Sequence, residues 1–278
     1  MKPLVVIFIT IIFTGCYAQS NITQNSEKPQ SQTCLSNFPY QEIVISPSEL
    51  QIISQKIYQN ECSGKYENLV TWNTGETFPS LGIGHFLWFP RGVKAPFTET
   101  FPVLIAYMQQ QGEQIPGWLT VLEDAPWTSY TEFKKQYNSH LVQQLRAFLA
   151  HTMRLQMAFI VERLNQSLPT IICTAEPATR EKIWHNFYAL AQTPGGIYPL
   201  VDYINFKGEG TSAQERYYGQ GWGLLQVLTE MDMRINPRLA FAKAAEFVLE
   251  RRVRNAPAER NEEQWLKGWK KRLLTYTQ

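Results

Sequence analysis

The sequence predicts a mainly helical α+β domain with one small β-sheet near residues 69–90. Apolar residues recur with helical spacing over most of the chain. Only Thr71 to Phe89 has strand character, with "WNTGET" as a turn and alternating glycines in "FPSLGIGHFLWF". Helices are expected at 46–61, 98–111, 139–168, 179–192, 219–232, 237–253 and 262–275. We find no internal repeat and no second long linker, so residues 34–278 should form a single domain.

The N-terminus indicates export. Residues 1–15, "MKPLVVIFITIIFTG", have one lysine and an apolar run too short to span a bilayer comfortably, as in a cleaved signal peptide. "FTGC" resembles a bacterial lipobox, which implies lipidation of Cys16. Residues 16–33 are polar and should form a tether. We expect a lipid-anchored protein on the periplasmic face of the envelope, at the outer membrane, or a secreted one. An uncleaved anchor is the alternative.

Charge and cysteine content restrict the function classes. A formal net charge of +2 gives no reason to expect a nucleic-acid partner. Four His and four Cys form no metal-ligand motif, and no cofactor or metal is expected. An oxidising compartment permits one disulfide among Cys34, Cys62 and Cys173, and the sequence leaves the pair open.

Glu61 is the first candidate catalytic residue. "SPSELQIISQKIYQNE" begins with a capping box, Ser46 and Glu49, and with Pro47 at the first helical position. Glu61 ends the apolar face of this helix, four residues after Ile57. Poor solvation and the negative end of the helix dipole both favour a protonated carboxyl, which glycosidic bond cleavage needs. The alternative is a surface glutamate at a frayed helix end.

The following segment resembles the lysozyme-like superfamily. "SLGIGH", Ser80 to His85, is similar to the "TIGIGH" strand of phage-type lysozymes, which follows a helix ending in the catalytic Glu. The resemblance implies that Glu61 is the general acid, that Ser80 positions the attacking water and that His85 supports the site. Glu61 lies nineteen residues before Ser80, a few more than in that family. The family's second carboxylate, an Asp, has no exact counterpart. Glu76 is the nearest acid, either an electrostatic partner or a solvated turn residue.

A second glycine-rich region spans residues 201–228. Here "GWGLLQVL" resembles the GLMQ segment that lines the saccharide groove of lytic transglycosylases, which implies substrate contacts by Trp222 and Gln226. Gln220, among the glycines just before this segment, is a further candidate for substrate binding. Glu209, between two glycines, is a rival catalytic acid, although the glycines can equally be turns. The basic tail from Arg251 resembles the closing helix of phage-type lysozymes and supports the fold.

Trp72, Trp88 and Trp222 fall inside these two regions and could stack on sugar rings or fill the core. Together these features predict a lysozyme-like glycosidase that cleaves β-1,4 bonds of peptidoglycan or a related amino-sugar polymer. Peptidoglycan, and the membrane through the N-terminal lipid, are the expected partners. The alternatives are a non-catalytic peptidoglycan-binding or scaffold lipoprotein, a lytic transglycosylase and a chitosanase-like enzyme.

Overall fold

The computed structural model describes residues 34–36, 38–95 and 98–278. The expected signal peptide, Cys16 and the tether lie outside the described residues. Cys34 and Cys173 form a disulfide, and Cys62 is a buried free thiol. This resolves which of the three candidate cysteines pair.

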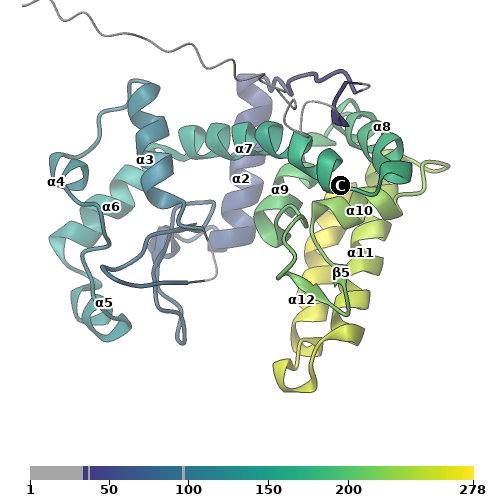
Figure 1. Cartoon of the computed structure of the whole chain (residues 1–278). Coiled ribbons are helices and arrows are strands. Elements are labelled where there is room, and N and C mark those ends of the chain that lie inside the picture. Colours follow the sequence, from purple (N-terminus) through teal and green to yellow (C-terminus); the bar gives the residue numbers. More distant parts are fainter. Residues whose placement is uncertain (1–33, 37, 96–97) are drawn as a thin grey trace, which may run out of the picture.

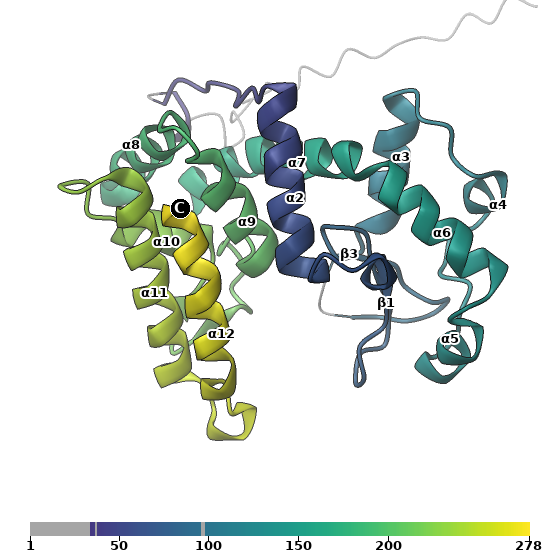
Figure 2. The same cartoon turned by 180° about the vertical axis from the view of Figure 1, so that it is seen from behind.

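Two helices stand at the centre of the molecule. Helix α2 (Pro47–Cys62) packs against the long helix α7 (Met153–Thr174), and both lie between two groups of elements (Figure 1). The view from behind also shows α2 and α7 between the two groups, with left and right exchanged (Figure 2). We call residues 63–95 and 98–152 the hairpin lobe, and residues 175–278 the C-terminal lobe. A single hydrophobic cluster extends from one lobe through α2 and α7 into the other.

The hairpin lobe contains a three-stranded antiparallel sheet in the order β1-β2-β3. Ser80 of the middle strand pairs with Thr71 on one side and Leu87 on the other. Short helices complete the lobe. The bounds are β1 (Val70–Thr71), β2 (Ser80–Leu81), β3 (Phe86–Leu87), α3 (Phe101–Gln110), α4 (Gly117–Thr120), α5 (Tyr130–Gln136) and α6 (His140–His151). The predicted fold class, mainly helical with a small sheet, is confirmed.

The C-terminal lobe is built from helices and one short hairpin. Its elements are α8 (Arg180–Ala191), α9 (Ile197–Lys207), β4 (Arg216–Tyr217), β5 (Gln220–Gly221), α10 (Leu224–Glu230), α11 (Pro237–Asn255) and α12 (Glu263–Leu274). Short 3₁₀ turns lie at 66–69, 177–179, 258–260 and 275–277. No helix in the described part of the chain is both long and apolar enough to span a bilayer.

Two predicted helices are wrong in their bounds. The helix expected over 139–168 is two helices, because the backbone changes direction at Thr152, which ends α6 and begins α7. The helix expected over 219–232 begins only at Leu224. Its first part forms the β4–β5 hairpin, which Gly219 turns with a φ of 75°. Helix α9, absent from the prediction, contributes Asn205 to the surroundings of Glu61.

Candidate active site

Glu61 lies where the two lobes meet. Helix α2 begins at Ser46, whose Oγ accepts a hydrogen bond from the Glu49 backbone N–H at 3.2 Å, and its buried face includes Ile53 and Ile57. The helix ends one residue after Glu61, and Ser63 then takes a left-handed conformation. The Glu61 side chain is 11% exposed. Its carboxylate is therefore held in the interior near the lobe junction.

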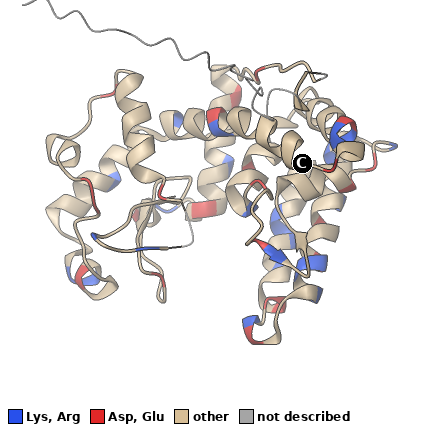
Figure 3. Ribbon diagram, viewed as in Figure 1, with Lys and Arg blue, Asp and Glu red and all other residues tan. Residues whose placement is uncertain are grey.

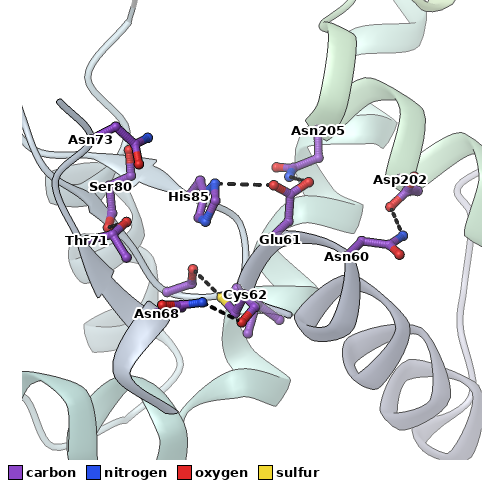
Figure 4. Close-up of polar contacts among 12 residues, drawn as sticks. Asn60, Glu61, Cys62, Asn68, Thr71, Asn73, Ser80, His85, Asp202 and Asn205 are labelled. Carbon is purple, nitrogen blue, oxygen red and sulfur yellow. Dashed lines mark hydrogen bonds and ion pairs between the residues drawn. The ribbon is translucent and has the colours of Figure 1, made fainter. Parts of the chain in front are cut away.

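Both lobes contact this carboxylate. From the hairpin lobe, His85 Nδ1 lies 3.2 Å from Glu61 Oε2 (Figure 4). From the C-terminal lobe, Arg272 Nη2 donates to Glu61 Oε1, and Asn205 Nδ2 of α9 approaches the same oxygen at 3.5 Å. The contacts thus come from three segments far apart in the sequence.

The turn before His85 needs glycine. Gly82 has a φ of 67°, and a Cβ built there would lie 2.2 Å from Gln156 Oε1. That oxygen accepts the Ile83 N–H at 2.8 Å, while Gln156 Nε2 donates to the Leu149 carbonyl at 2.7 Å. The α7 glutamine therefore braces the "SLGIGH" turn. His85 itself has a φ of 47° and is 32% exposed, so it is the more open member of the pair.

Arg272 is held by a second, fully buried carboxylate. Its Nε and Nη2 donate to the two oxygens of Asp202 at 2.7 and 2.8 Å. Tyr276 and Asn60 also donate to Asp202, at 2.6 and 2.9 Å. Burial and the Asp202 carboxylate hold the pKa of Tyr276 well above its usual value, so Tyr276 stays a donor. Two carboxylates, Glu61 and Asp202, thus face one guanidinium.

This setting differs from the one expected from the helix alone. Burial of Glu61 is present, but His85 and Arg272 both stabilise negative charge there. Asp202 accepts four hydrogen bonds, whereas Glu61 has three polar partners, so Glu61 is the less tightly held of the two carboxylates.

Ser80 and Glu76 occupy different settings in the hairpin lobe. Ser80 is buried in β2, with its carbonyl accepting from Thr71 Oγ1 at 3.3 Å. Glu76 is exposed in the turn, and Asn73 Nδ2 donates to its Oε2 at 3.2 Å. Figure 4 shows Asn73, Ser80 and His85 on the same side of Glu61. Within the described residues no hydrogen bond or ion pair joins Glu76 to Glu61, so Glu76 is placed as a turn residue.

Glu209 is directed toward α7. It accepts from Ser167 Oγ at 2.6 Å and from Thr211 Oγ1 at 3.3 Å. The glycines around it allow two backbones to pack closely, since a Cβ at Gly223 would lie 2.1 Å from the Gly210 nitrogen. Gln226 braces this crossing: it accepts the Gly223 N–H at 2.9 Å and donates to the Gly210 carbonyl at 3.0 Å. Gln226 thus holds the two backbone segments together, and the Glu209 side chain attaches its loop to α7 through Ser167.

The candidate sugar-stacking residues are mostly buried. Trp72 is 6% exposed and donates to the Glu76 carbonyl, and Trp88 is 1% exposed and packs on Phe101. Trp222 is covered by Arg252, whose guanidinium carbon lies 4.1 Å from the ring centroid. Buried rings cannot stack on a sugar, so these three belong to the core. Gln220 is exposed, and its Oε1 accepts from Asn255 at 3.1 Å.

Sequence reasoning missed Arg272, Asn205 and Asp202. Arg272 lies in a lysine-rich tail in which nothing distinguishes it from its neighbours. Asp202, by contrast, is the one acid in the apolar segment "IYPLVDYINF". This is the same signal that singled out Glu61, so it could have been found.

The described residues contain no group of three or more His, Cys, Asp or Glu side chains placed to hold a metal ion. Comparison of the chain with protein-family models, with curated proteins and with solved structures finds no match. A functional assignment therefore has to rest on the geometry around Glu61.

Proposed function

We propose that this protein is a glycosidase that cleaves β-1,4 bonds of peptidoglycan or a related amino-sugar polymer. The proposal places it on the periplasmic face of the cell envelope, anchored through a lipid on Cys16. The observation that carries the proposal is the Glu61 carboxyl, enclosed at the lobe junction and contacted by His85 and Arg272 from opposite lobes. The resemblance of "SLGIGH" to phage-type lysozymes supports it.

Glu61 acts as the general acid. Its proton goes to the glycosidic oxygen as the bond from that oxygen to the sugar's anomeric carbon breaks, which leaves positive charge on the sugar ring. The Glu61 carboxylate then has Arg272 and His85 as partners, so the negative charge that develops on Glu61 is stabilised as it forms. Water attack and return of a proton to Glu61 complete hydrolysis. Asp202 keeps Arg272 in position throughout.

Lytic transglycosylation is the second candidate, and the placement of Glu76 favours it. Hydrolases of this kind normally use a second carboxylate, whereas a transglycosylase can use one Glu and let a hydroxyl of the sugar attack. Glu76 is exposed and accepts a hydrogen bond from Asn73, and no hydrogen bond or ion pair joins it to Glu61 in the described part of the chain. The lysozyme-like "SLGIGH" turn, which brings His85 to Glu61, favours hydrolysis, which remains our first choice.

The products of a peptidoglycan digest test both candidates. Hydrolysis should release muropeptides with reducing ends, and transglycosylation should release 1,6-anhydro products that are lighter by one water. Mass spectrometry separates the two. If Glu76 is an electrostatic partner, Glu76→Gln should lose most of the turnover; if Glu61 works alone, that variant should stay within about twofold of wild type. An anhydro product with a neutral Glu76→Gln would overturn hydrolysis. Binding without any released fragment would favour the scaffold alternative.

A further inference from the structure

A row of stacked rings and cations leads away from Glu61 into the C-terminal lobe. The Arg272 guanidinium carbon lies 4.2 Å from the centroid of Phe206, the residue after Asn205. Lys207 Nζ lies 4.0 Å from the same ring and 3.5 Å from the Trp269 ring. Arg252 continues the row, 5.2 Å from Trp269. The row therefore contains three basic side chains on neighbouring aromatic faces.

Only two of these three basic side chains form ion pairs with carboxylates of the described residues. Arg272 donates to Asp202 and Glu61, and Arg252 donates to the buried Glu262 at 2.7 and 2.8 Å. Among the described residues, no carboxylate forms an ion pair with Lys207. Lys270 in the same lobe is different, because it pairs with Glu246 at 2.8 Å and Glu250 at 2.5 Å. Lys207 is thus a basic side chain in the row with Arg272, the partner of Glu61, and it has no carboxylate partner among the described residues.

The surroundings of Lys207 disfavour its charge in the absence of a ligand. Burial lowers the pKa of the amine to about 6, with Arg252 and Arg272 adding to the effect and Glu262 and Glu61 opposing it. The amine is therefore mostly neutral at pH 7. Lys207, Phe206 and Trp269 are each only partly buried, so each of them keeps some surface exposed to solvent. Figure 3 shows that Lys and Arg residues gather on the helices of this lobe.

We propose that Lys207 binds a carboxylate of the substrate next to the sugar held at Glu61. The substrate class is then an amino-sugar chain with free carboxylates, as in peptidoglycan, rather than a neutral chitin-type chain. This inference rests on the proposed function. An incoming carboxylate supplies the missing counter-charge, and Lys207 takes up a proton as the charge-assisted hydrogen bond forms.

Isothermal titration calorimetry with the inactive Glu61→Gln protein tests the proposal, because this variant should bind the ligand without cleaving it. In Glu61→Gln protein, soluble chains of peptide-bearing disaccharides should bind, and adding Lys207→Met should weaken binding about tenfold or more. Lys207→Arg should retain most of the affinity.

Titration at pH 7 in buffers of different ionisation enthalpy should show uptake of a proton on binding. This uptake should fade near pH 5, where Lys207 is already charged, and Lys207→Met should abolish it. Lys56→Met is the matched control, since Lys56 also lies over a ring, 4.5 Å from the Tyr198 centroid.

Modified ligands identify the carboxylate. In intact chains the free carboxylates lie on the stem peptides, because each lactyl carboxyl is in the amide bond to the stem. Removal of the stems by an amidase frees the lactyl carboxylates, and chains amidated with carbodiimide and ammonia have no free carboxylate. A Lys207→Met effect confined to the intact chains assigns a stem carboxylate. An effect confined to the amidase-treated chains assigns the lactyl carboxylate, and an effect on both ligands shows that Lys207 binds either carboxylate. Equal effects on all three ligands, or none, would overturn the proposal. That failure is distinct from failure of the proposed function, in which wild-type protein releases no fragment from peptidoglycan.

Discussion

The two glycine-rich regions have the same construction and different outcomes. In each, a glutamine from a helix occupies the place of a missing Cβ: Gln156 beside Gly82 and Gln226 beside Gly210. The first turn presents His85 to Glu61 across the lobe junction. The second is closed on its own backbone and directs Glu209 to Ser167. Dense glycines therefore indicate close approach of two backbone segments, and the side chain that the turn presents decides whether a site results.

Substitution of Gly82 or Gly210, the two glycines that contact a helix glutamine, should change stability and turnover the most. Gly82→Ala and Gly210→Ala each force a left-handed backbone on alanine and displace the glutamine, so each should lower the free energy of unfolding by about 2–3 kcal/mol. Urea denaturation measures this. Under conditions where both variants are folded, Gly82→Ala should lose turnover on peptidoglycan because His85 shifts. Gly210→Ala should retain it.

The control is Gly75→Ala, since Gly75 also has a positive φ but no atom within 4 Å of a built Cβ. It should show the backbone cost alone. Equal loss of turnover in the Gly82 and Gly210 variants would remove the distinction between the two turns.

Much of the framework was predictable from local signals. The capping box at Ser46 fixed the start of α2, and Gly112 and Pro237 marked the end of α3 and the start of α11. The order of acid, hairpin and "SLGIGH" was also readable. The break at Thr152 was not, because both helices continue the same apolar period and the change of direction depends on packing between the lobes.

The partners of Glu61 were beyond local signals for a related reason. Arg272 reaches Glu61 across 211 positions in the sequence, and Asn205 across 144. Pairing over such separations is decided by how α9 and α12 pack, which spacing along the chain does not encode. Trp72 and Trp88 show the converse: their types suit both core and sugar binding, and only burial separates the two.

The rate at which the Cys62 thiol is labelled should report opening of the Gly82 turn, with a smaller expected effect. Burial, and to a lesser extent the Glu61 carboxylate, raise the pKa of its thiol to about 12, and its Sγ lies 3.6 Å from the Gly82 carbonyl oxygen. At pH 8 about one thiol in ten thousand is ionised. Iodoacetamide should therefore label Cys62 slowly, through opening of the Gly82 turn. Mass spectrometry under non-reducing conditions follows the rate.

Gly82→Ala should accelerate this labelling beyond what its loss of global stability explains, and Gly210→Ala should not. Rapid labelling of the wild-type protein, or equal acceleration in both variants after correction for stability, would show that the Gly82 turn does not control access to Cys62.

The identity of the proton donor is tested by the release of soluble fragments from peptidoglycan by Glu61→Gln and by Glu209→Gln. Circular dichroism and co-sedimentation with the polymer first establish that each variant is folded and binds. If Glu61 is the proton donor, Glu61→Gln should lose on the order of a hundredfold or more in turnover, while Glu209→Gln stays within a few-fold of wild type. Full activity of Glu61→Gln, or a larger loss in Glu209→Gln, would contradict the account.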